Sequence, residues 1–230
     1  MENILVPLDG SSLTEVALPF ASAIAARTGA DLTLLHTARH RTPFRDVGVE
    51  QVRAIENGEE YLTGIASGLR KSGVGVDTHV SLGRSPAEWI LEQSERPRKS
   101  LIVMATHDRA GPDRWLHGSV AEAVVHRTTV PVMLVRGTAD VLVAQRFEMH
   151  EPTLLVPLDG SGLGDAALPF AGELARATGA RVIFVAVVPN PGQPVAGAGG
   201  AILSYDGPEQ GTLEAEAGPY AGTRQLAPTG

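Results

Sequence analysis

Apolar and polar residues follow each other in blocks from the start of the chain to Arg136, and these blocks predict alternating strands and helices. Short apolar runs are separated by longer segments in which apolar residues recur at helical spacing. The runs predict strands at residues 4–8, 31–36, 76–82, 101–106 and 130–135. The periodic segments predict helices at residues 13–28, 49–71, 85–93 and 119–127. This alternation indicates βαβ units, a parallel sheet with right-handed crossovers and an α/β fold.

The hydrophobic pattern at the start of the chain recurs later. LVPLDGSSLTEVALPFASAIAARTGA at residues 5–30 returns as LVPLDGSGLGDAALPFAGELARATGA at residues 155–180, 150 positions later and without a gap. Seventeen of the 26 aligned positions are identical. Chance does not produce such a match, so the sequence indicates a tandem duplication.

The two copies predict domains of unequal extent. Residues 1–140 contain a complete α/β unit, whereas residues 151–190 provide only a strand, a helix and a strand. Residues 191–230 contain 9 glycines and 5 prolines, about a third of the segment. That composition is typical of poorly ordered sequence, and we expect little stable structure in this tail.

Composition excludes several functions. The chain is 43% hydrophobic, which is ordinary for a globular protein, and its net charge of −7 argues against general nucleic-acid binding. It contains no cysteine, which excludes disulfides, thiolate catalysis and cysteine metal sites. We see no signal peptide and no apolar run of the roughly 20 residues that a membrane span requires. We therefore expect a cytoplasmic protein without membrane or nucleic-acid partners.

Asp9 follows the first predicted strand, and two interpretations of it are open. A turn between a strand and a helix favours aspartate, and Ser12 with Glu15 fits a capping box. Alternatively, ligands of doubly wound sheets bind beyond the carboxyl ends of the strands, where Asp9 would contact a ribose hydroxyl or a metal ion. Asp159 repeats the residue in the second copy. That copy has no counterpart of the loop after the predicted strand 101–106, so we expect no similar site there.

The segment after the predicted strand 101–106 is the second candidate. Gly118 and Ser119 open a helix, which is ordinary capping chemistry. Free amides and a hydroxyl at a helix start also suit a phosphate. His107 and His117 lie in this loop and are expected to be surface residues rather than ligands.

Together, these features resemble the universal stress protein family. The residues that carry the resemblance are ILVPLDGS at 4–11, VMATHDRAGPDRWLHGSVAEAVV at 103–125 and VPVMLVR at 130–136. The resemblance covers residues 3–136 as a full domain and residues 154 to about 189 as the start of another. It implies a flavodoxin-like, doubly wound, five-stranded parallel sheet of order 3-2-1-4-5, dimerisation through the last strand and a role in stress survival.

The family also implies a nucleotide loop. One branch binds ATP, with Mg²⁺, through Gly-x2-Gly-x9-Gly followed by Ser or Thr. In this chain the glycine positions hold Ala105, Asp108 and Gly118, with Ser119 next. The site residues that the resemblance implies are Pro7, Leu8, Asp9, Met104, Ala105, Thr106, Asp108, Arg109, Gly118, Ser119 and Val120.

Asp108 opposes this assignment because it brings a carboxylate toward the phosphates. Two unit charges about 4 Å apart at an effective dielectric near 20 repel by about 4 kcal/mol. A bridging cation, or rotation of Asp108 toward Arg109, would reduce that repulsion.

Three functions therefore stay open. The chain is a stress-response protein that binds an adenine nucleotide and regulates unknown partners, an interaction module with a vestigial pocket, or a slow ATPase or related enzyme. No catalytic residue and no metal ligand is assigned. Separately, the apolar strand that begins at Val130 and ends at Val135 would be an unpaired edge, and we expect it to form a homodimer.

Overall fold

The described part of the chain forms two compact units. The computed structural model describes residues 1–38, 47–106, 119–136, 152–159, 161–186, 193–196 and 202–206. The first unit comprises Met1–His150 and the second Glu151–Gly230. The boundary lies just before the second copy of the sequence repeat.

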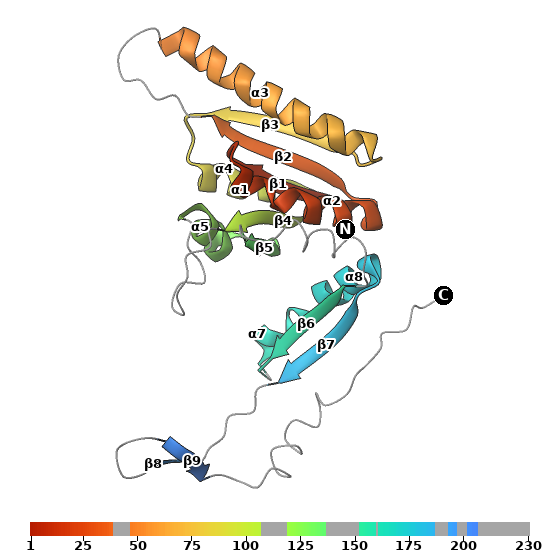
Figure 1. The fold of residues 1–230 in the computed structure, drawn as a ribbon, viewed down its shortest axis with the longest axis vertical. Helices are drawn as coiled ribbons and strands as arrows, with labels where there is room; N and C mark the ends of the chain where they lie inside the picture. The colour runs from red at the N-terminus through yellow and green to blue at the C-terminus, as the bar shows by residue number, and fades with distance from the viewer. Residues whose placement is uncertain are drawn as a thin grey trace. The chain divides into compact units, whose positions relative to one another are not determined.

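The first unit is built on a five-stranded parallel sheet of order β3-β2-β1-β4-β5, which confirms the predicted α/β class and strand order. Its strands are β1 (Asn3–Leu8), β2 (Asp31–Ala38), β3 (Val76–Leu82), β4 (Lys99–Thr106) and β5 (Val132–Arg136), as Figure 1 shows. β1 pairs with β2 along its whole length, but its pairing with β4 ends at Leu5. The carboxyl ends of β1 and β4 are therefore not joined by ladder hydrogen bonds.

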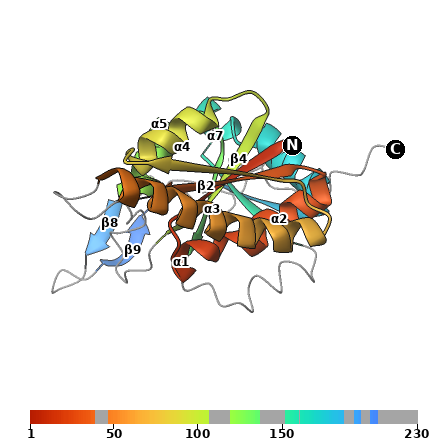
Figure 2. The same cartoon turned by 90° about the horizontal axis from the view of Figure 1, so that it is seen from above.

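Helices cover both faces of this sheet. They are α1 (Ser12–Glu15), α2 (Ala17–Thr28), α3 (Val47–Lys71), α4 (Pro86–Ser94) and α5 (Ser119–Arg127). α2 and α3 pack on one face, while α4 and α5 pack on the other (Figure 2). This arrangement buries the central strands on both sides and explains their continuous apolar runs.

The predicted helix 13–28 is two helices in the structure. α1 ends at Glu15, and α2 begins at Ala17. Pro19 lies in the first turn of α2, and it has no N–H to donate to the Glu15 carbonyl four residues earlier. α2 ends where expected, at Gly29, whose φ of 71° is left-handed and whose N–H donates to the Ala25 carbonyl.

The core between the sheet and α4/α5 is apolar and tightly buried. Leu5, Leu35 and Ile102 are at most 1% exposed, and they pack with Trp89 and Ile90 of α4. Burying one such side chain stabilises the fold by about 1.5–3 kcal/mol. The cluster therefore fixes α4 against the carboxyl halves of the strands.

The second unit repeats the first strand, helix and strand. β6 (Thr153–Leu158) pairs in parallel with β7 (Arg181–Ala186), and the register is that of β1 with β2: Thr153 pairs with Arg181 as Asn3 pairs with Asp31. α7 (Gly162–Asp165) and α8 (Leu168–Thr178) connect the strands. Leu155 is 63% exposed, whereas Leu5 at the matching position of the first unit is 0% exposed.

The glycine-rich segment 191–230 contains a short hairpin where we expected little structure. β8 (Gln193–Ala196) pairs antiparallel with β9 (Ile202–Asp206). The other residues of this segment lie outside the described part of the chain.

Candidate nucleotide site

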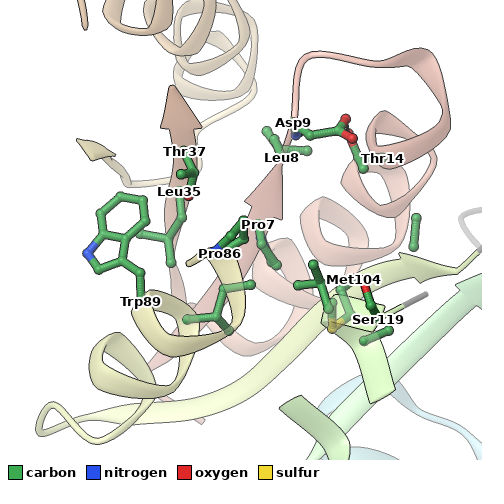
Figure 3. Close-up of a pocket in the computed structure, with 14 residues that line it drawn as sticks. Pro7, Leu8, Asp9, Thr14, Leu35, Thr37, Pro86, Trp89, Met104 and Ser119 are labelled. Carbon is green, nitrogen blue, oxygen red and sulfur yellow. Dashed lines mark hydrogen bonds between the residues drawn. The ribbon is translucent and has the colours of Figure 1, made fainter. Parts of the chain in front are cut away.

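A pocket of about 280 Å³ lies at the carboxyl ends of β1 and β4. In the observed strand order the switch point of the sheet lies between β1 and β4, which is where α/β proteins bind ligands. The lining residues are Pro7, Leu8, Asp9, Thr14, Leu35, Thr37, Pro86, Trp89, Ile90, Met104, Ala105, Ser119, Val120 and Ala121. Figure 3 shows Trp89 on the side of the pocket away from Asp9 and Ser119.

Seven of the eleven predicted site residues line this one pocket: Pro7, Leu8, Asp9, Met104, Ala105, Ser119 and Val120. Thr106, the last residue of β4, does not line it. The predicted residues Asp108, Arg109 and Gly118 lie outside the described residues.

The prediction missed a second group of lining residues. Leu35 and Thr37 come from β2, and Pro86 and Trp89 come from α4. Their contribution depends on β2 being the neighbour of β1 and on α4 covering that face. The Ser85-Pro86 start of a helix was visible in the sequence, but its place beside the pocket was not.

Asp9 holds the turn that follows β1. Its Oδ1 accepts hydrogen bonds from Ser11 N at 2.9 Å, Ser11 Oγ at 2.6 Å and Thr14 Oγ1 at 2.9 Å. Gly10 has a φ of +86°, a conformation that glycine adopts without Cβ strain. None of these three bonds from Ser11 and Thr14 goes to Oδ2. That oxygen can accept a further donor without disturbing the turn.

These hydrogen bonds set the charge of Asp9. Partial burial raises the pKa of its carboxyl, but the bonds from Ser11 and Thr14 together lower it more, so the net pKa lies below the usual value. Asp9 is therefore an anion at neutral pH, and an anionic acceptor makes stronger hydrogen bonds than a neutral one.

The cap of α1 differs from the predicted capping box. Ser11, not Ser12, is the N-cap, and its Oγ accepts the Thr14 N–H at 3.4 Å. The Glu15 carboxylate accepts a hydrogen bond from the Tyr61 hydroxyl of α3 at 3.0 Å instead of bonding a cap amide. The amide of the observed N-cap, Ser11, donates to the Asp9 carboxylate instead of to Glu15, so the prediction was wrong at both positions.

The same turn recurs in the second unit with fewer partners. Asp159 Oδ1 accepts from Ser161 N at 2.9 Å and Ser161 Oγ at 2.6 Å. The position that matches Thr14 is Gly164, which has no hydroxyl to donate. The strand-turn-helix sequence therefore forms this turn without the threonine.

Ser119 supplies the opposite polar wall of the pocket. It is the exposed first residue of α5, and Val120 and Ala121 line the pocket beside it. The amides of a first helical turn have no partner within the helix, and the dipole makes that end positive. The wall thus offers a hydroxyl and backbone donors to an anion.

Within the described ranges, no group of three or more His, Asp or Glu side chains is placed to hold a metal ion. In the same part of the chain, no helix combines the length and the apolar character needed to cross a membrane.

Comparison with known proteins decides the family. Residues 1–136 and 152–227 match the model of the universal stress protein family. The chain belongs to the universal stress protein family. Both of its units match, so the tandem arrangement is that of two universal stress protein segments. The second match extends beyond residue 189, where the resemblance in the sequence ended.

Individual relatives agree with this assignment. A universal stress protein of Mycolicibacterium smegmatis is 33% identical over 134 residues, which cover 58% of this chain and 45% of that protein. One from Methanocaldococcus jannaschii is 30% identical over 141 residues, which cover 59% of this chain and 82% of that protein. The match therefore spans about half the length of the first relative and most of the second.

The fold agrees as well. A crystal structure of a universal stress protein from Archaeoglobus fulgidus superposes with a TM-score of 0.63 at 24% identity. The match covers 81% of this chain and 67% of that one.

Proposed function

We propose that the first unit binds an adenine nucleotide, and that this universal stress protein acts in stress survival by regulating partners rather than by turning over a substrate. The observation that carries the proposal is the pocket that Asp9, after β1, and Ser119, at the start of α5, line together. The pocket lies at the switch point of the sheet. The sequence that follows β4 has the residue spacing of the family's nucleotide loop.

The lining suits the parts of a nucleotide. Leu35, Trp89 and Ile90 offer an apolar wall to the base, and Oδ2 of Asp9 offers an acceptor to a ribose hydroxyl. The first turn of α5 and Ser119 offer donors to phosphates. Its volume of about 280 Å³ is near the lower end of small-molecule pockets. Any Mg²⁺ would bind together with the nucleotide, since this ion usually takes one or two protein carboxylates plus substrate phosphates as ligands.

The test is calorimetric titration of the full chain with ATP and Mg²⁺. The chain should bind, and Asp9→Asn should weaken binding by about tenfold, because one charge-assisted hydrogen bond is lost. Asp159→Asn makes the same change in the copied turn and should leave affinity unchanged. Absence of heat with the unaltered chain at millimolar ATP overturns the proposal.

A second candidate is an interaction module whose pocket no longer takes nucleotide. It is favoured by Ala105, which puts a methyl group into the pocket lining where the family's motif has glycine, and by Asp108 at the next glycine position. If the unaltered chain binds no ATP, the double variant Ala105→Gly, Asp108→Gly decides whether these residues block an intact pocket. Binding by the double variant supports that account, and no binding contradicts it.

We also propose a homodimer through β5. Within the described residues, this strand pairs with β4 on one side only, and Val132, Met133 and Leu134 are half-buried. An apolar edge of this kind is an aggregation hazard unless it is paired. Sedimentation should show a dimer at micromolar concentration, and a monomer at high micromolar concentration contradicts the proposal.

A further inference from the structure

His36 lies behind the pocket wall. Its neighbours in β2, Leu35 and Thr37, both line the pocket. Side chains alternate along a strand, so His36 points to the opposite face of the sheet, where α3 packs. There its ring packs against Tyr61 of α3 in a tilted arrangement, with centroids 5.5 Å apart and planes at 58°.

His36 holds the peptide bond that enters the Asp9 turn. Its Nδ1 lies 3.1 Å from the Leu8 carbonyl oxygen, and because a carbonyl only accepts, Nδ1 carries the proton. The N–H of the same peptide, that of Asp9, donates to Thr14 Oγ1 at 3.3 Å. One peptide plane is thus fixed from both sides, by β2 and by α1.

α3 closes this network. The Tyr61 hydroxyl, which stays protonated because burial and then Glu15 raise its pKa, donates to Glu15, the neighbour of Thr14. Gly58, one turn earlier in α3, leaves space for the imidazole: a Cβ there would lie 2.9 Å from Cδ2 of His36.

The second unit shows whether the turn needs this hydrogen-bond network in order to form. We call the two hydrogen bonds that His36 and Thr14 make to the Leu8–Asp9 peptide the clamp. The positions that match His36 and Thr14 in the second unit are Ala186 and Gly164, so the clamp is absent there. Even so, the Asp159 turn has the same two Ser161 hydrogen bonds, at the same distances as in the first unit. The turn therefore forms without the clamp. This indicates that the clamp serves the pocket beside the turn, which is a feature of the first unit.

We propose that His36 is a positioning residue for the nucleotide site, which fixes the Leu8–Asp9 peptide and makes the orientation of Asp9 depend on how α3 is packed. This inference rests on the proposed nucleotide binding. It gives α3 a route to regulate the pocket, because a partner that shifts Tyr61 or Gly58 would release the imidazole from the Leu8 carbonyl.

His36→Phe is the main test, since it keeps a ring against Tyr61 but has no donor. The control is His79→Phe, at an exposed position of the neighbouring strand β3. In the full chain without nucleotide, His36→Phe should speed hydrogen exchange of the Asp9 amide by about fivefold and raise the ¹³C titration midpoint of the Asp9 carboxyl. With Mg-ATP it should weaken binding by about fivefold, and His79→Phe should change none of these.

Tyr61→Phe, which removes the hydroxyl that bonds Glu15 and the Gly10 backbone, gives the second variant and should shift the same readouts in the same direction. If both variants fold and bind ATP with unchanged affinity, the inference is overturned. If the unaltered chain binds no ATP, the proposed function fails, while the exchange and titration of Asp9 still report on the clamp. Unchanged Asp9 readouts in that case overturn the clamp itself.

Discussion

Thr14 and Asp9 are joined by two hydrogen bonds that run in opposite directions. The Thr14 hydroxyl donates to Asp9 Oδ1 at 2.9 Å, and it accepts the Asp9 N–H at 3.3 Å. One hydroxyl therefore fixes both the carboxylate and the backbone of the residue at the mouth of the pocket.

Thr14→Val should raise the pKa of the Asp9 carboxyl and lower the free energy of unfolding by about 1 kcal/mol, because the carboxylate loses a donor. A ¹³C NMR titration measures the pKa, and urea unfolding measures the stability. The Asp159 carboxyl, whose turn has Gly164 in place of the threonine, is an internal reference that should not move. An unshifted Asp9 midpoint would mean that Ser11 alone sets its charge.

The lowered pKa of Asp9 also predicts how stability depends on pH. The unfolded carboxyl has a pKa near 3.9 and the folded one a lower value, so the unfolded state binds the proton more readily. This contribution is fully present above that unfolded pKa and is lost as pH falls through the folded pKa. Urea midpoints measured from pH 6 down to pH 2 should fall less steeply in Asp9→Asn than in the unaltered chain. Parallel curves would contradict the assignment.

Gly58→Ala should destabilise the first unit. The new Cβ would lie 2.9 Å from His36 and 3.0 Å from Val80, and such overpacking costs about 1–3 kcal/mol. Gly64→Ala, in the same helix, meets no atom within 4 Å and should stabilise by up to about 1 kcal/mol through helix propensity. Thermal unfolding of the two variants should move in opposite directions, and a stabilised Gly58→Ala would show that α3 is not closely packed there.

The duplicated leucines give a matched pair. Leu5→Ala should cost about 2–5 kcal/mol, because Leu5 is fully buried in the core. Leu155→Ala should cost less than about 0.5 kcal/mol, because that side chain is 63% exposed. Residue-resolved NMR during urea unfolding follows each unit separately. Equal losses would show that Leu155 is covered in solution.

The sequence predicted the elements well where a single periodicity governs a segment. α5 and β3 have the predicted bounds, because apolar residues at helical spacing span α5 and apolar residues stand at both ends of β3. The split at Val16 was missed although Pro19 is visible, since the apolar spacing continues through the break. The capping error at Ser12 arose because the neighbouring Ser11, which Asp9 holds in place, caps α1 one residue earlier.

The candidate site was predicted only along two segments. Asp9 and Ser119 were found because the rule for doubly wound sheets names the ends of β1 and β4. Trp89 and Leu35 were missed because each reads as part of an ordinary helix or strand, and Thr37 was missed because it lies just beyond the predicted strand 31–36. Their role follows from which strand lies beside β1 and which helix covers it, and no local pattern contains that information.

The strand order carries a consequence for how the chain folds. Pairing Ile4 with Leu32 closes a short loop, whereas pairing Ile4 with Leu101 closes a loop more than three times as long. The longer closure costs about 1 kcal/mol more entropy if both loops are flexible. We therefore expect β1, α2 and β2 to assemble first, and β4 to dock afterwards in the slower step. Pulse-labelled hydrogen exchange should protect β2 before β4, and the reverse order would contradict this. The segment expected to fold earliest is also the one that the chain carries twice.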